Sequence, residues 1–66
     1  MIYIVSATIN DDAISVEFSN GQSSNGIILR NYNGAYLTYF PESHTLVHLN
    51  LRYRDFEILA KGVTIA

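Results

Sequence analysis

Three Asn-Gly pairs divide this 66-residue chain: Asn20-Gly21, Asn25-Gly26 and Asn33-Gly34. An Asn-Gly pair favours positive φ at both central positions of a two-residue turn, the geometry that reverses a strand into a β-hairpin. On both sides of these pairs, apolar and polar residues alternate at a period of two, as they do in half-buried strands. The turns and the alternation together predict an all-β chain.

The first predicted hairpin joins residues 2–9 to residues 14–18 through Asn10-Asp11-Asp12, because Asn and Asp tolerate left-handed φ and favour turns. The second strand alternates cleanly, with Ile14, Val16 and Phe18 on one face. The first strand is apolar on both sides at its start. Its strict alternation places four residues on one face: Tyr3, Val5, Ala7 and Ile9.

The second predicted hairpin joins residues 27–30 to residues 35–40 across Asn33-Gly34. Before it, residues 19–26 are too polar to hold a core position, and they form either a flexible loop or a glycine-hinged strand. The strand over residues 35–40 is apolar on both faces. Such a strand is either covered on both sides within the fold or lies at an interface.

Pro41 ends that strand, because it cannot donate to a ladder, and a turn over residues 41–44 follows. Residues 46–53 alternate most clearly of all, which predicts a strand, although a short helix near residues 53–60 stays open as an alternative. Residues 56–59 and 63–65 are expected to form short strands around Lys61-Gly62. The expected fold is a single domain, residues 1–66: a small antiparallel meander of five to six strands bent into a barrel or rolled sheet.

Composition limits the classes of function. A chain of this length buries only about 60% of its unfolded surface, and with no cysteine it has no disulfide to compensate. Self-association or a protein partner is the expected source of further burial. The net charge of −2 disfavours nucleic acid as the partner. No stretch is long and apolar enough for a bilayer, and the start of the chain lacks the features of a signal peptide, so we expect a cytoplasmic protein.

No motif for catalysis, metal binding or phosphate binding is present. His44 and His48 have the spacing of a helical chelate, but on a strand they lie roughly 13 Å apart. The carboxylates fall on turns and strand faces that water covers, and a small β-domain leaves little volume for an enclosed substrate pocket of about 300 Å³ or more. We therefore expect no enzyme, no cofactor and no metal site.

Two surfaces are candidates for binding a partner. One is the polar face of the predicted strand over residues 46–53, with two of the four basic residues of the chain: His48, Asn50, Arg52 and Arg54. It suits an acidic surface or phosphates, or it pairs across strands with Glu17 or Glu57. The other is a tyrosine cluster that serves either as a contact surface or as core: Tyr32, Tyr36 and Tyr39.

Residues 18–32 resemble the first motif of Sm-like RNA-binding rings, in which two glycines at the spacing of Gly21 and Gly26 precede a hydrophobic strand. The resemblance covers under a quarter of the chain. Ser23-Ser24 stand where the family has an apolar strand, and Asn33 stands one position from the family's Asp. The resemblance implies a small barrel that binds single-stranded RNA or DNA.

The leading hypothesis is a non-enzymatic protein-interaction module that self-associates through a strand edge or through the strand holding Tyr36, Tyr39 and Phe40. Its size suits a small inhibitor or adaptor, of the kind that phages and mobile elements encode, docking on a larger macromolecule. The alternative is an Sm-like barrel that uses Arg52 and Arg54 for phosphates and tyrosines for stacking. A small enzyme or metal site is the third hypothesis.

Overall fold

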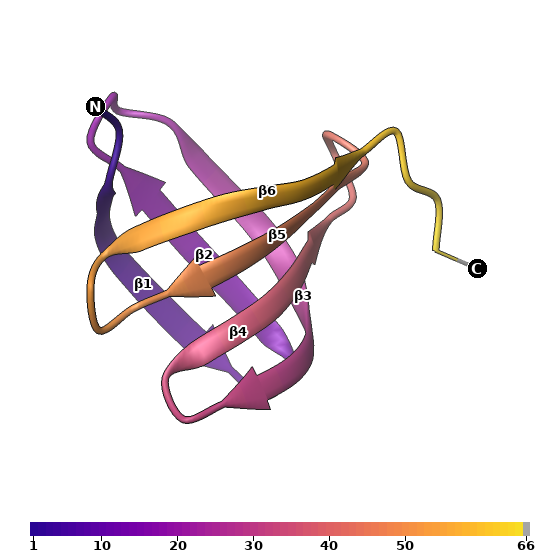
Figure 1. The fold of residues 1–66 in the computed structure, drawn as a ribbon, viewed down its shortest axis with the longest axis horizontal. Coiled ribbons are helices and arrows are strands. Elements are labelled where there is room, and N and C mark those ends of the chain that lie inside the picture. The colour runs from indigo at the N-terminus through magenta and orange to yellow at the C-terminus, as the bar shows by residue number, and fades with distance from the viewer. Residues whose placement is uncertain (66) are drawn as a thin grey trace.

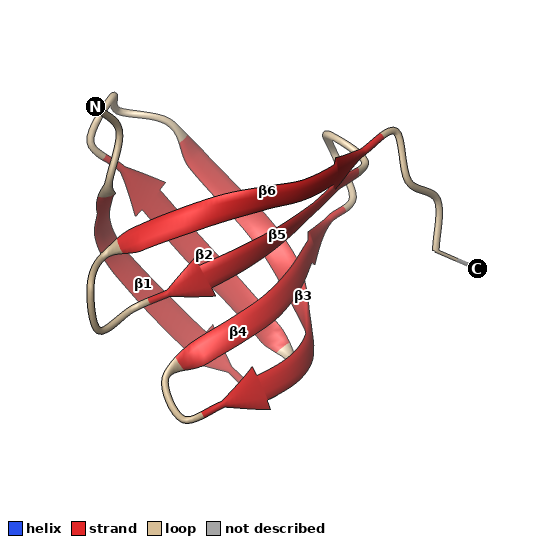
Figure 2. Ribbon diagram, in the orientation of Figure 1, coloured by secondary structure: helices blue, strands red, loops and turns tan. Residues whose placement is uncertain are grey.

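The structure is a computed structural model, and it describes residues 1–65. Its six strands are β1 (Ile4–Asn10), β2 (Ala13–Phe18), β3 (Ser23–Tyr32), β4 (Ala35–Phe40), β5 (Thr45–Asn50) and β6 (Asp55–Lys61). They form one antiparallel sheet in the order β1-β2-β3-β4-β5-β6, so each strand pairs with its neighbours in sequence (Figures 1 and 2). The predicted all-β meander is confirmed, with six strands.

The three Asn-Gly pairs have three different roles. Asn33-Gly34 closes the β3–β4 hairpin with φ values of 49° and 95°, as predicted for a two-residue turn with positive φ at both positions. Asn20-Gly21 lies in the short connection between β2 and β3, where Gly21 has a φ of 88°. Asn25-Gly26, in contrast, lies inside β3. The polar segment over residues 19–26 is therefore partly a strand.

Gly26 is buried in that strand, which contradicts the expectation that this polar segment holds no core position. A Cβ atom at Gly26 would lie 2.6 Å from Cγ2 of Thr38 and 2.9 Å from the ring of Phe40. Glycine is therefore present at this position because β4 side chains occupy the space that any other side chain would need.

A β-bulge changes which face of β1 is buried. The pairing of β1 with β2 shifts between Ile4 and Ser6, which leaves Val5 as the extra residue. Ile4 is 2% exposed, whereas Val5 is 47% exposed. The predicted face of Tyr3, Val5, Ala7 and Ile9 is thus wrong, because strict alternation cannot continue through a bulge.

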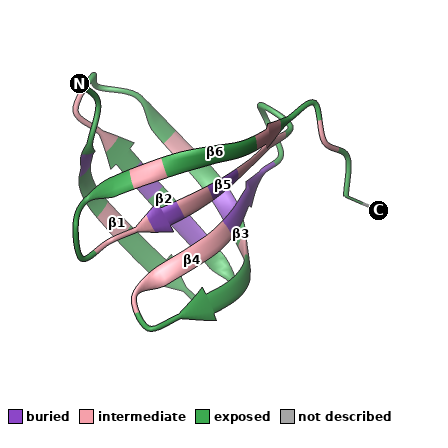
Figure 3. Cartoon of the chain, viewed as in Figure 1, coloured by how far each residue is buried: buried purple, intermediate pink, exposed green. Residues whose placement is uncertain are grey.

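The core joins the two halves of the sheet. Its buried residues come from β1, β2, β4 and β5: Ile4, Ile14, Val16, Phe40, Val47 and Leu49. In Figure 1, the half containing β4, β5 and β6 lies across the half containing β1, β2 and β3, and Figure 3 shows buried segments on strands of both halves. The sheet does not close into a barrel. Among the described residues, only the backbone N–H of Ile4, which donates to the Arg54 carbonyl at 2.9 Å, links β1 to the turn that precedes β6.

The last third of the chain departs from prediction in two places. The first is the predicted strand over residues 46–53, which ends at Asn50 and is followed by a turn over residues 51–54. The next strand is β6, so of the two alternatives for residues 53–60 the strand is found and the helix is not. Residues 63–65 do not form a strand. Instead, the N–H of Val63 donates to the His44 carbonyl at 2.9 Å, which holds the end of the chain against the β4–β5 turn. None of the described residues form a helix that is long and apolar enough to cross a membrane.

Candidate functional site

An open cleft of about 510 Å³ lies where the β2–β3 connection, the β4–β5 turn and β6 approach one another. The cleft is open to solvent, so it does not test the expectation about an enclosed pocket. We call it the phenylalanine cleft. The residues that line it are Ile2, Phe18, Asn20, Gln22, Ser23, Ser24, Phe40, Glu42, Ser43, Thr45, Val47, Phe56 and Ile58.

The apolar part of the lining contains all three phenylalanines of the chain. The rings of Phe18 and Phe56 meet edge to face, with centroids 5.1 Å apart and an interplanar angle of 63°. This geometry is favourable for aromatic pairs, and it joins β2 to β6 across the inside of the bent sheet. Phe40 is 5% exposed and packs in the core. The aromatic surface is therefore in place before anything binds.

The rim of the phenylalanine cleft consists of amides and hydroxyls, and its loops are held by local hydrogen bonds. The side chain of Asn20 donates to Oε1 of Gln22 at 3.1 Å and accepts from the Gln22 N–H at 3.0 Å. On the opposite side, the hydroxyl of Thr45 donates to the Ser43 carbonyl at 2.9 Å. These bonds order the rim, which lowers the entropic cost of binding there.

The lining of the phenylalanine cleft is mainly apolar and uncharged. Glu42 is the only charged residue in it, and its serines have no histidine or lysine beside them in the lining. A nucleophile needs an adjacent base, and acid–base catalysis needs a partner for the carboxylate. No three side chains of the types that ligate metals group together within residues 1–65. The cleft thus offers an apolar surface surrounded by neutral hydrogen-bonding groups and one carboxylate, that of Glu42.

The structure separates the three tyrosines of the predicted contact cluster. Tyr32 is exposed on β3, and its hydroxyl accepts a hydrogen bond from the Arg30 guanidinium at 3.3 Å, which raises the pKa of Arg30. Its ring lies 6.4 Å from that of His48. Tyr36 is half-buried against the core.

Tyr39 is buried on β4, and its hydroxyl serves an internal contact. It donates to the Val63 carbonyl at 2.6 Å and lies 3.2 Å from Nδ1 of His44. Phe40 is also buried. Of the two alternatives for residues 35–40, the central strand is the one found, since β4 lies between β3 and β5 and its last three residues are buried. Self-association of the chain stays a prediction.

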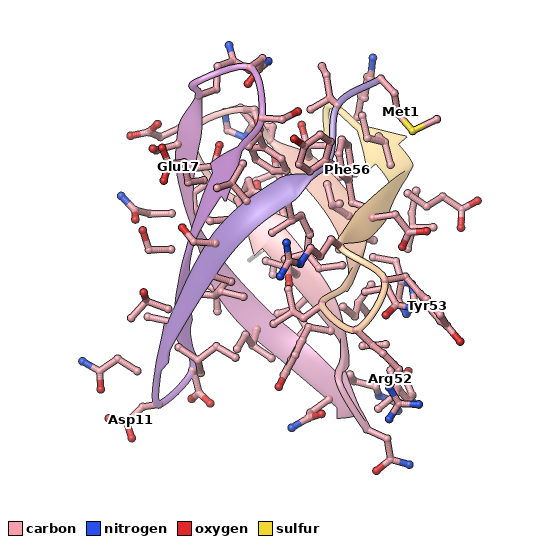
Figure 4. The ribbon with its side chains drawn as sticks, turned by 90° about the vertical axis from the view of Figure 1, so that its left-hand side faces the viewer. Met1, Asp11, Glu17, Arg52, Tyr53 and Phe56 are labelled. Atoms are coloured by element: carbon pink, nitrogen blue, oxygen red, sulfur yellow. The ribbon has the colours of Figure 1, made fainter. Side chains whose placement is uncertain are left out.

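The predicted polar face of four residues does not form, because β5 ends at Asn50. The Asn50 side chain accepts hydrogen bonds from the N–H groups of Arg52 and Tyr53, at 3.2 and 3.3 Å, and so begins the turn. His48 stays on β5 opposite Glu57. Arg52 projects from the turn beside Tyr53, away from the sheet (Figure 4). Whether any of these residues binds a partner stays a prediction.

The sequence did not identify the phenylalanine cleft. Phe18 and Phe56 are 38 positions apart in the chain, and the period of each strand says only that Phe18 faces inward. The one indication of the cleft in the sequence was that its three phenylalanines, Phe18, Phe40 and Phe56, fall on three different predicted strands. No family model, no curated protein and no solved structure matches this chain, so a function for it can be argued only from its geometry.

Proposed function

We propose that this chain is a non-enzymatic protein-interaction module that binds an extended segment of another protein in the phenylalanine cleft. The observation that carries the proposal is an ordered aromatic surface that stays open beside an edge strand. Ligand sites are typically apolar with a few placed polar groups, and this cleft has that composition. Its one carboxylate, Glu42, has no catalytic partner in the lining.

An extended segment fits because β6 is an edge strand and supplies Phe56 and Ile58 to the lining. A segment added beside β6 would form main-chain hydrogen bonds with it, and every second side chain would point toward the aromatic surface. The amides and hydroxyls of the rim would bond the remaining peptide groups. Because Glu42 is the only charge in the lining, a segment with a large apolar side chain next to a lysine or arginine fits best.

The test is a selection of random twelve-residue peptides against the wild-type protein, followed by affinity measurement; an extended peptide of this length, roughly 40 Å, exceeds the length of the seven-residue β6. We expect the selected peptides to combine an aromatic or large aliphatic anchor with a basic residue, and to shift the backbone NMR signals of Phe18, Ser24 and Phe56. Ser24→Trp, which fills the cleft, should weaken binding at least about tenfold, or about 1.4 kcal/mol.

Ser15→Trp is the matched control, since Ser15 is an exposed strand serine outside the lining. It should bind the selected peptides like the wild type. The proposal is contradicted if Ser24→Trp stays folded and binds them unchanged, or if the NMR shifts fall on another surface.

A second candidate function, binding of single-stranded nucleic acid, draws support from the β5–β6 turn. Tyr53 is 72% exposed there between Arg52 and Arg54. An exposed aromatic ring flanked in sequence by two arginines could supply a stacking surface and two phosphate contacts. Replacing both arginines by alanine should then weaken binding of an oligonucleotide and reduce its salt dependence. If wild-type protein binds no oligonucleotide at low salt, this candidate is removed.

A further inference from the structure

The two edges of the sheet differ in charge. The β6 edge carries Asp55, Glu57 and Lys61, whereas no residue of β1 is charged. Charged side chains on an edge strand disfavour pairing between two sheets, although a single segment of complementary charge can still pair with such an edge. The β6 edge has this protection. The β1 edge has none.

Exposed apolar side chains lie on β1 and on the segment that precedes it, and β6 also exposes two, Ile58 and Leu59. Of the twelve large hydrophobic residues that are exposed in the described part of the chain, five lie in its first nine positions: Met1, Ile2, Tyr3, Val5 and Ile9. In Figure 4, β1 runs across the front of the molecule, between the labelled Met1 and Asp11, and no strand lies in front of it. An unpaired, uncharged edge with this much apolar surface is typical of an interface.

We propose that β1 pairs antiparallel with β1 of a second copy of this chain, around a two-fold axis, so that two six-stranded sheets become one. A two-fold interface is self-complementary, so each residue of the strand must tolerate a residue of the same strand opposite it. A strand without charges meets this condition in any register, whereas two copies of β6 meet it only in registers that keep Asp55 and Glu57 of one copy away from those of the other. The second copy is therefore the occupant that the charge pattern selects.

The geometry of the hairpin fixes the register. Asn10 and Ala13 flank the two-residue β1–β2 turn and form a hydrogen-bonded pair, and Ser15 is the partner of Thr8. Because hydrogen-bonded and non-hydrogen-bonded positions alternate, the backbone groups of Ala7 and Ile9 point away from β2. A register centred on Thr8 uses them all, since Ala7 of each copy then lies opposite Ile9 of the other. The bulge at Val5 ends the regular pairing on one side, and the turn ends it on the other.

Thr8 provides the test, because in this register the two Thr8 side chains face each other at the axis. The mass of the wild-type protein in solution, measured by light scattering from about 10 μM to about 1 mM, should rise to twice 7.4 kDa. Thr8→Lys and Thr8→Glu should each weaken the dimer about tenfold or more, since like charges directly opposite repel. An equal mixture of the two variants should restore the dimer as a heterodimer, which a folding defect could not produce.

Ser15→Lys is the matched control. Ser15 is exposed and lies beside Thr8, but one strand away from the edge. It should leave the dimer intact. Three results would each overturn the proposal: a wild-type chain that stays at 7.4 kDa throughout, a Thr8→Lys dimer as tight as the wild type, or a mixture of the Lys and Glu variants that stays monomeric. Thr8 is not part of the lining of the phenylalanine cleft, so the Thr8 variants test the dimer separately from peptide binding, although Ile2 belongs to both surfaces.

Discussion

Replacing Gly26 by alanine tests the packing of the bent sheet at its tightest point. The new Cβ atom would lie 2.6 Å from Cγ2 of Thr38 and 2.9 Å from two ring atoms of Phe40. Carbon atoms in contact normally stay about 3.5–4.0 Å apart, so one of the neighbours must move. Thr38 is fully buried and β-branched, with few rotamers available, and Phe40 is fixed in the core.

The expected cost follows from two opposing effects. Overpacking a core typically destabilises by about 1–3 kcal/mol, whereas replacing glycine by alanine restricts the unfolded chain and returns about 0.4–1 kcal/mol. Gly26 has no positive φ, so no backbone strain adds to the sum. We expect a net loss of about 1–2 kcal/mol. At about 4–8 °C for each kcal/mol in a chain of this size, the midpoint of thermal unfolding should fall by roughly 5–15 °C.

Urea unfolding, followed by circular dichroism, measures this loss, and a double-mutant cycle identifies its cause. Thr38→Ser removes the methyl group that lies 2.6 Å from the new Cβ atom. In the Thr38→Ser background, the alanine at position 26 should therefore cost at least about 0.5 kcal/mol less than in the wild type. An alanine variant within about 0.5 kcal/mol of the wild type would refute the packing argument. So would an equal cost in both backgrounds.

Two further predictions concern the turn before β6 and the end of the chain. Arg54 has a φ of 58°, a left-handed backbone conformation that is strained for any residue with a Cβ atom, so Arg54→Gly should raise the free energy of unfolding. Arg52→Gly, in the same turn, should lower it. Urea unfolding should separate the two variants by about 1–2 kcal/mol, and equal values would contradict backbone strain at Arg54. Tyr39→Phe removes the hydroxyl that donates to the Val63 carbonyl, so it should lower the free energy of unfolding by about 0.5–1.5 kcal/mol and speed amide hydrogen exchange near Val63. Tyr53→Phe, at an exposed position, should change neither the free energy of unfolding nor the exchange rate.

The sequence predicted the strands and hairpins because their determinants are local. Asn33-Gly34 specifies its turn through the φ preferences of two residues, and the alternation over residues 14–18 specifies a half-buried strand. Prediction failed where a non-local contact overrides the local pattern. The bulge at Val5 reverses the exposed face of β1, and Asn25-Gly26 became strand because β4 packs against Gly26.

The candidate site was less predictable than the fold for the same reason. Its apolar surface depends on the contact between Phe18 and Phe56, which exists only once the sheet has bent. The predicted polar face failed at Asn50, because a side chain that accepts two turn N–H groups ends a strand whatever the hydrophobic pattern beyond it. An alternation with a period of two does not show where such a strand ends. The end of the strand could be predicted if it were known which asparagine side chains accept hydrogen bonds from nearby backbone N–H groups.

The incomplete closure of the sheet connects the stability of the chain with its proposed function. Closing a barrel requires the first and last strands to pair along their length, and here one hydrogen bond, from Ile4 to Arg54, joins β1 to the turn before β6. Full pairing would cover the Phe56 and Ile58 side of the phenylalanine cleft and would also occupy β1. In the open arrangement, the charged β6 edge lies beside the phenylalanine cleft, and the uncharged β1 edge, with its exposed apolar side chains, stays free. A partner strand at either edge would bury surface that a chain of 66 residues cannot bury alone. Binding at either edge should therefore raise the midpoint of unfolding.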